Sequence, residues 1–390
     1  MIRDGEHLRV FGSPPAVAVA SPGRVNLIGE HIDYLGGRVM PVAIDRHLVI
    51  EASPSEDGCF EIVPVQAGFG GPVRFGAGDL DRRAAKEDRW LNYLLGVIAG
   101  YREKGVDVPA FRAAIHADLP AGAGLSASAA LETATALVIE AFAGLSTLVA
   151  ERAVLCQRAE HDYAGVPCGI MDQLAVGAGK AGHALLVDCH DLSTRLVPLP
   201  EDLVLLVTDT GVKHALGDGE YRKRREQCEE ALGVLGAASF RGLGGEEIEA
   251  EKERLGDLRY RRARHAVSEM RRVDEFAEAL RDGDQEALGR LLLEGHVSLR
   301  DDYEVSCAEL DALVEAGYGF GRERGHVGTR MTGGGFGGTA ISLVRRDAAG
   351  DLCRHLQDAF AARFGRIPDA FVTSAVDGAR PFAVESPPNP

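Results

Sequence analysis

The chain has 390 residues, 45% of them hydrophobic, and a formal net charge of −16 at pH 7. This length favours two domains. The acidic balance argues against a broad nucleic-acid-binding surface, which would need clustered lysine and arginine. No run of about 18 apolar residues is present, and the charged N-terminus lacks the apolar core of a signal peptide. We therefore expect a globular, cytoplasmic protein with no nucleic-acid or membrane partner.

Strand and helix patterns alternate through the first half of the chain. Alternating residues 16–20 predict a strand that ends at Ser21-Pro22-Gly23. Further strands are predicted at 46–52, 59–65, 183–189 and 203–210, and helices at 126–143 and 146–161. The proline-containing segment 187–201 is the preferred domain boundary, which gives domains 1–195 and 196–390.

The second half is richer in helical patterns. Helices are predicted around 221–235, 263–280, 307–316 and 352–364, and strands at 339–344 and 370–376. The fold class is therefore α/β (α+β), with a mixed-sheet N-terminal domain and an α+β C-terminal domain. The seven cysteines include no CxxC pair and are odd in number, so we expect reduced, mostly buried thiols.

The stretch LPAGAGLSASAALE, residues 119–132, joins a glycine-rich loop to an alanine-rich helix. Gly122-Ala123-Gly124 lets backbone N–H groups approach a ligand, and the helix behind it presents unpaired donors to an anion. No Gly-Lys-Ser/Thr follows, so this is not a Walker loop. A close-packed glycine turn is the competing interpretation. Ser126 and Ser128 would either cap the helix or offer oxygens to a phosphate-bound metal.

A second cluster occupies residues 21–37, SPGRVNLIGEHIDYLGG. Arg24 offers a charged fork for phosphate oxygens, whereas Glu30, His31 and Asp33 offer acceptors and a donor for the hydroxyls of a sugar. A structural ion pair between Arg24 and Glu30 or Asp33 is the alternative.

These residues resemble a known family. GRVNLIGEHIDYLGG is similar to the galactokinase signature, and LPAGAGLSASAALE to the phosphate-binding motif of the wider GHMP kinases. AEHDYAGVPCGIMDQLA, residues 159–175, resembles the galactokinase segment with the catalytic aspartate, and TGGGFGGTAISLV the C-terminal glycine motif. The four segments follow the family's order, so the resemblance covers nearly the whole chain and implies the two-domain GHMP kinase fold with a cleft between the domains.

The resemblance implies roles for individual residues. Asp172 matches the catalytic aspartate and Arg24 the arginine that faces it. An aspartate can accept or orient a hydroxyl proton, while the arginine offsets charge on the transferring phosphoryl group. The sugar-binding positions are Glu30, His31, Asp33, Gly169 and Tyr221.

ATP and Mg²⁺ are implied in the same way. The phosphate loop comprises Gly122, Ala123, Gly124, Leu125, Ser126, Ala127 and Ser128. Ser128 and Glu160 match a Mg²⁺-coordinating pair, although Glu160 is also consistent with a solvated helix end. Trp90 resembles a residue beside the adenine, where its ring would stack on the base, with a core position as the alternative.

The expected reaction is ATP-dependent phosphorylation of the anomeric hydroxyl of D-galactose to α-D-galactose 1-phosphate. Ile32 and Leu35 depart from the usual galactokinase pattern, so N-acetylgalactosamine, arabinose and galacturonate stay open as substrates. A catalytically inactive sugar- and ATP-binding regulator is disfavoured by the presence of Arg24 and Asp172. A nicotinamide site at Gly333–Gly338 is disfavoured because that run leads into a strand rather than a helix. The sequence does not determine the oligomeric state, and a monomer is one of the possible states.

Overall fold

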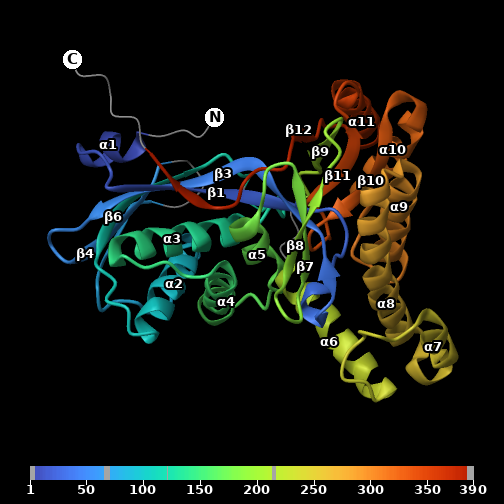
Figure 1. Ribbon diagram of the computed structural model, residues 1–390, viewed down its shortest axis with the longest axis horizontal. Coiled ribbons are helices and arrows are strands. Elements are labelled where there is room, and N and C mark those ends of the chain that lie inside the picture. Colours follow the sequence, from blue (N-terminus) through green and yellow to red (C-terminus); the bar gives the residue numbers. More distant parts are fainter. Residues whose placement is uncertain (1–4, 66–70, 121, 213–216, 384–390) are drawn as a thin grey trace.

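The computed structural model describes residues 5–65, 71–120, 122–212 and 217–383. A long sheet with helices against it forms the N-terminal part, and a second sheet with long helices forms the C-terminal part beside it (Figure 1). No helix among the described residues has the length and apolar character needed to cross a membrane.

The N-terminal sheet has the strand order β13-β1-β3-β6-β4-β5 within the described residues. Its strands are β1 (Val17–Asn26), β3 (Pro41–Pro54), β4 (Cys59–Pro64), β5 (Val73–Gly76), β6 (Phe111–Ala117) and β13 (Arg380–Phe382). The sheet is mixed because β4 and β6 are parallel while the other pairs are antiparallel. The predicted end of the first strand at Ser21-Pro22-Gly23 is wrong. A register shift between Pro22 and Gly23 accommodates the proline, and β1 continues to Arg24 and beyond.

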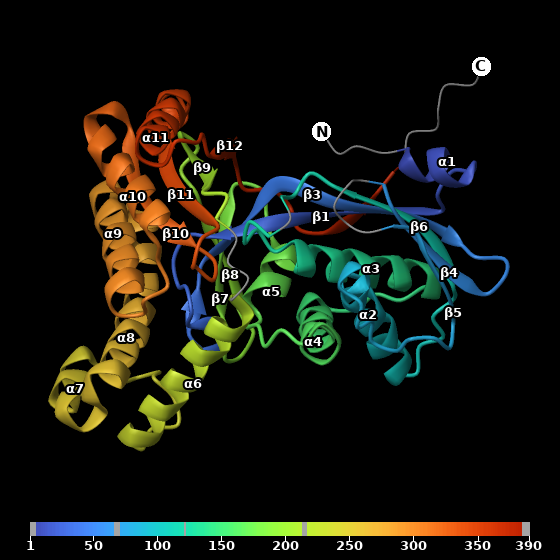
Figure 2. The same cartoon turned by 180° about the vertical axis from the view of Figure 1, so that it is seen from behind.

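Four helices cover one face of this sheet, and α1 (Glu6–Phe11) lies at its far end (Figures 1 and 2). They are α2 (Leu91–Glu103), α3 (Ala127–Ala143), α4 (Val149–Ala159) and α5 (Met171–Ala178). Short turns of helix lie at η1 (Asp33–Leu35), η2 (Lys86–Asp88) and η3 (Glu160–Ala164). Helix α3 ends as predicted, because Gly144 takes a left-handed φ of 66° directly after it.

The C-terminal sheet has the order β10-β11-β9-β12, and a small sheet with the order β2-β7-β8 lies between the two halves. The strands are β2 (Arg38–Val39), β7 (His183–Asp188), β8 (Thr194–Pro198), β9 (Leu203–Asp209), β10 (His326–Thr332), β11 (Thr339–Arg345) and β12 (Asp369–Thr373). The helices are α6 (Gly217–Leu235), α7 (Gly245–Ala250), α8 (Lys252–Asp282), α9 (Gln285–Asp301), η4 (Arg322–Arg324), α10 (Ala308–Phe320) and α11 (Ala349–Phe364).

The chain does not divide cleanly at residue 195. The proposed cut falls inside β8, which pairs with β7, and β13 returns to the N-terminal sheet. The larger hydrophobic core also includes Val273, Phe276 and Leu291 from α8 and α9. All seven cysteines are free, but only Cys156 and Cys228 are buried, so the expectation of mostly buried thiols is only partly met.

Candidate active site

Arg24 and Asp172 form a two-point ion pair. Arg24 extends from β1, and Asp172 lies in the first turn of α5. Arg24 Nε donates to Asp172 Oδ1 and Nη2 to Oδ2, both at 2.7 Å. The interpretation that pairs Arg24 with Glu30 or Asp33 is therefore wrong. The arginine side chain is 6% exposed and the aspartate 24%, so the pair is shielded on the arginine side and open on the aspartate side.

The glycine loop lies directly beside this pair. Arg24 Nη1 donates to the carbonyl of Gly124 at 2.5 Å, and the Ser126 hydroxyl donates to Asp172 Oδ2 at 2.7 Å. Gly122, Gly124 and Ser126 take left-handed φ values of 77°, 74° and 61°. The predicted capping role of the Ser126 hydroxyl is not found. It does not cap α3, and it fixes the carboxylate of Asp172 instead.

Glu30, in the loop after β1, and Asp33, the first residue of η1, line the same cavity. Both are at least nine-tenths buried, and burial raises the pKa of Glu30 to about 7 and that of Asp33 to about 6. The negative charge of Asp172 further raises the pKa of Asp33. Gly169 packs against Asp33 so closely that a Cβ there would overlap the carboxylate. Three predicted sugar-binding positions are thus brought together.

His31 lies in the same cavity but offers no free ring nitrogen. A carbonyl only accepts, so Nε2 carries the proton and donates to Gly334 O at 3.1 Å. Burial lowers the pKa of His31 to about 4, so the ring is neutral and Nδ1 accepts from the Tyr34 hydroxyl at 3.0 Å. Tyr221 of α6 lines the cavity beside it, with its ring 5.2 Å from that of His31.

Glu160 is buried at the start of η3 and is not the solvated residue of the alternative interpretation. Gln173 Nε2 donates to Glu160 Oε2 at 2.8 Å, and the Ser128 hydroxyl is within hydrogen-bonding reach. Burial raises the pKa of Glu160 to about 7, and the charge of Asp172 adds to this effect. Among the described residues no group of three or more His, Cys, Asp or Glu is arranged to hold a metal. Ser128 and Glu160, the pair predicted to coordinate Mg²⁺, lie within hydrogen-bonding reach of each other.

The C-terminal glycine run forms the opposite wall. Gly333 and Gly338 take left-handed φ values of 81° and 74° and lie against the glycine loop. Thr339 Oγ1 donates to Ala123 O at 2.6 Å, which ties β11 to that loop. The prediction of a tight turn beside the phosphate loop is confirmed. The run leads into β11, so the helix that a dinucleotide site requires is missing at this position.

Together these elements enclose a cavity of about 350 Å³, within the range of small-molecule sites. The residues singled out in the motifs that line it are Arg24, Glu30, His31, Asp33, Gly122, Gly124, Glu160, Gly169, Asp172, Tyr221, Gly333 and Gly335. Motif matching did not single out Val166, Pro167, Cys168, Met171, Gly334 and Phe336, which also line it. All six lie inside two of the quoted motifs, residues 159–175 and 332–344, but no role was predicted for their side chains.

Three other residues lie outside this lining. Trp90, at the start of α2, is half-buried against the N-terminal core. Ile32 is fully buried in that core, and Leu35 packs between the two cores. The departures of Ile32 and Leu35 from the family pattern therefore do not change the surface of the cavity.

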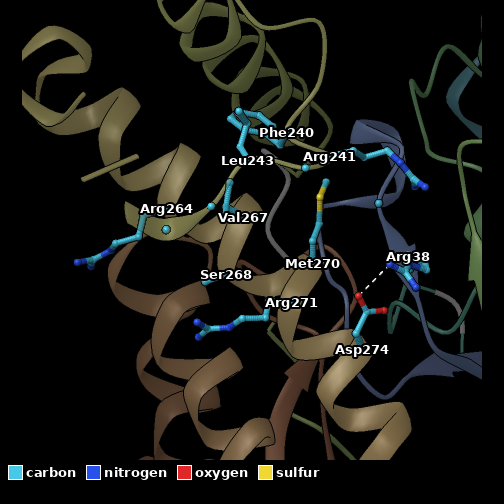
Figure 3. Close-up of a pocket in the computed structure, with 14 residues that line it drawn as sticks. Arg38, Phe240, Arg241, Leu243, Arg264, Val267, Ser268, Met270, Arg271 and Asp274 are labelled. Carbon is cyan, nitrogen blue, oxygen red and sulfur yellow. Dashed lines mark ion pairs between the residues drawn. The ribbon is translucent and has the colours of Figure 1, made fainter. Parts of the chain in front are cut away.

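A second cavity, of about 400 Å³, lies between strand β2, helix α8 and the loop that precedes α7 (Figure 3). No predicted site residue lines it. Its arginines all have carboxylate partners. Arg38 forms a 2.8 Å ion pair with Asp274, drawn in Figure 3, and the other pairs are Arg241–Asp188, Arg264–Asp302 and Arg271–Glu275. The Arg24–Asp172 pair lines the first cavity and not this one.

Comparisons with known proteins match this arrangement. Models of the galactokinase galactose-binding signature, the GHMP kinase N-terminal domain and the GHMP kinase C-terminal region match residues 5–54, 92–180 and 276–362. The galactokinase of Homo sapiens is 44% identical over 374 residues, covering 95% of this chain and 93% of the human protein. That of Streptomyces coelicolor is 41% identical over 382 residues, covering 96% and 97%.

Solved structures agree with the sequence relatives. The crystal structure of Lactococcus lactis galactokinase complexed with galactose has a TM-score of 0.91 and 32% identity, covering 96% of this chain and 97% of that one. Methanococcus jannaschii mevalonate kinase, at 18% identity and a TM-score of 0.62, covers 94% of this chain and all of its own, and shows the shared GHMP kinase fold. On this sequence and structural evidence, the chain belongs to the galactokinase family of GHMP kinases.

Proposed function

We propose that this protein transfers the γ-phosphoryl group of ATP to the anomeric hydroxyl of D-galactose, giving α-D-galactose 1-phosphate. The observation that carries the proposal is the Arg24–Asp172 pair, which lies in one cavity between the signature carboxylates and the glycine loop. The near-full-length similarity to galactokinases supports the choice of sugar.

Asp172 orients the sugar hydroxyl and accepts its proton in this mechanism. Its oxygens receive hydrogen bonds from Arg24 and Ser126, which fix the carboxylate before substrate arrives. Arg24 then offsets the negative charge that develops on the transferring phosphoryl group. The arginine is held in turn by the carbonyl of Gly124, so the pair and the phosphate loop form one rigid unit.

Glu30 and Asp33 bind the sugar in this proposal. Both residues line the cavity, and an ionised carboxylate accepts hydrogen bonds from hydroxyl groups. Tyr221 supplies an aromatic wall beside His31. Gly169 leaves the space that Asp33 occupies, because any side chain there would displace the carboxylate.

ATP phosphates lie over the glycine loop and the start of α3, where backbone N–H groups and the helix dipole favour anions. Ser128 and Glu160 fit Mg²⁺, since this hard cation is coordinated by hydroxyl and carboxylate oxygens. Its remaining coordination positions would be filled by water and phosphate oxygens. The raised pKa of Glu160 also fits, because no cationic partner of this buried carboxylate is found among the described residues. Bound Mg²⁺ would neutralise phosphate charge. Stacking of adenine on Trp90 and a cytoplasmic location stay predictions.

A panel of sugars tests the substrate. Galactose, N-acetylgalactosamine, arabinose, glucose and galacturonate are each incubated with ATP and Mg²⁺, and ADP release is followed. We expect kcat/KM to be highest for galactose and turnover to be lost in Asp172→Asn. A higher kcat/KM for another sugar would change the assigned substrate, and binding without turnover for every sugar would point to an inactive regulator.

A further inference from the structure

The sugar-signature segment Gly29-Glu30-His31 is held by the C-terminal half of the chain. Glu269 Oε1 on α8 accepts the backbone N–H of Gly29 at 2.9 Å. His265, one turn earlier on α8, donates from Nε2 to the carbonyl of Glu30 at 3.2 Å. His31 donates to Gly334 after β10. Consecutive residues of one short segment are therefore each anchored by a residue more than 200 positions later in the chain.

Arg330 of β10 completes this anchoring. It is fully buried, donates from Nη2 to Glu30 Oε2, and donates from Nη1 and Nη2 to Glu269 Oε1 at 3.1 Å. Arg272 pairs with the other oxygen of Glu269 at 2.7 Å. The result is a buried chain of alternating charge, from Glu30 through Arg330 and Glu269 to Arg272.

The backbone of the anchored segment cannot relax to another ordinary conformation without losing these contacts. Gly29 has a φ of 103°, and a Cβ there would lie 2.9 Å from Val39 Cα. His31 has a φ of 62°, in the left-handed region that non-glycine residues seldom adopt. Such a conformation persists only when its surroundings impose it. The contacts of Glu269, Arg330 and His265 are those surroundings.

We propose that Arg330 and Glu269 are positioning residues that set the affinity for the sugar by aiming the Glu30 carboxylate into the cavity from the C-terminal half. This inference rests on the proposed function, because it takes Glu30 as a sugar ligand. Neither Arg330 nor Glu269 lines the cavity, so each acts through Glu30 and not through contact with substrate.

The same geometry sets the charge of Glu30. Burial favours its protonated form, and the nearby Glu269 adds to this, whereas Arg330 opposes both. The nearby rings of His265, which bonds the Glu30 carbonyl, and of His31 are neutral, because burial lowers their pKa values to about 3 and about 4. Arg330 is thus the cation that keeps Glu30 available as an acceptor near pH 7.

Arg330→Lys tests the proposal, because lysine keeps the charge but loses the planar fork that joins Glu30 to Glu269. We expect KM for galactose to rise by about tenfold or more, as for other buried charge pairs that lose a partner, while kcat and KM for ATP change little. In Arg330→Met the acid limb of kcat/KM for galactose should move to higher pH. Glu269→Gln, which removes the charge facing Arg330, should also raise KM for galactose.

A double-mutant cycle separates positioning from general support of the fold. If Arg330 acts through Glu30, Arg330→Lys should have little further effect on galactose KM in a Glu30→Gln background. Arg152→Lys is the matched control, because Arg152 makes a buried two-point pair with Glu140 elsewhere, with the Nη2 bond at 2.7 Å. It should lower the melting temperature and leave both KM values unchanged.

An equal rise in galactose KM in both backgrounds, or none in an active, folded Arg330→Lys protein, would overturn the inference. Its failure is distinguishable from that of the proposed function. If the wild-type protein does not phosphorylate galactose, the function itself fails. If the wild-type protein phosphorylates galactose but the double-mutant cycle shows no coupling between Arg330 and Glu30, only the inferred positioning role is refuted.

Discussion

Replacing Glu160 by glutamine should stabilise the protein at alkaline pH while weakening its use of Mg²⁺. Glu160 is 5% exposed, and burial followed by the charge of Asp172 raises its pKa from 4.5 to about 7. The folded state therefore binds this proton more tightly than the unfolded state. Stability from this group is present below pH 4.5 and is lost as pH rises to about 7. Above that, an ionised Glu160 costs about 3 kcal/mol, at 1.36 kcal/mol per unit of pKa.

Glutamine carries no such cost. The difference in unfolding free energy should therefore approach about 3 kcal/mol at pH 8 and fall below about 1 kcal/mol at pH 5. With an unfolding entropy of about 2 cal/mol/K per residue, 3 kcal/mol corresponds to a rise of about 4 °C in melting temperature. Calorimetry of metal-free protein at both pH values measures this. Glu56→Gln, an exposed loop substitution, is the control and should change neither value.

The same variant should need more Mg²⁺ for half-maximal turnover, because the proposed carboxylate ligand is gone. A gain in stability with a loss of function is the expected trade-off for a charged active-site residue. A melting temperature at pH 8 equal to or below that of wild type, with the control unchanged, would refute the argument that an uncompensated charge is buried here.

Two further predictions concern substrate binding. Gly169→Ala should raise KM for galactose by about tenfold or more without changing KM for ATP, because the added methyl group displaces the Asp33 carboxylate. Steady-state kinetics with each substrate varied in turn measures both KM values. An unchanged KM for galactose would argue against Asp33 as a sugar ligand. Trp90 is the only tryptophan in the chain, so ATP should quench the intrinsic tryptophan fluorescence if adenine stacks on it. Galactose should leave the fluorescence unchanged. Unchanged fluorescence with saturating ATP would place the base elsewhere.

The motifs predicted which distant residues lie close together in the structure. Arg24, Asp172 and the glycine loop were predicted to meet because each lies in a distinct motif, and they lie together in the structure. Helix α3 was well bounded because glycines mark both of its ends. The predicted first strand ended too early. A proline usually interrupts a strand, and nothing in the sequence indicated that a bulge in the pairing with β3 would accommodate Pro22.

Long-range partners that the motifs do not identify could not be predicted. Ser126 has the type and position of a helix cap, yet its hydroxyl bonds Asp172, 46 residues away. Arg330 and Glu269 stand in segments with no chemical motif of their own, and their role appears only when β10 and α8 meet the loop after β1. His31 was predicted to bind the sugar and does line the cavity, but nothing in the sequence indicated that Gly334 and Tyr34 bond both of its ring nitrogens.

Parallel binding and turnover measurements on Asp172→Asn test the central claim most directly. Asparagine keeps the shape of the side chain and can still bond Arg24, but it removes the carboxylate that orients the hydroxyl. Calorimetric titration should show galactose and a non-hydrolysable ATP analogue binding within a few-fold of wild type, while kcat falls by about 100-fold or more. A variant that retains full turnover would contradict the role given to Asp172, and with it the convergence of Arg24, the glycine loop and the sugar signature on one reacting hydroxyl.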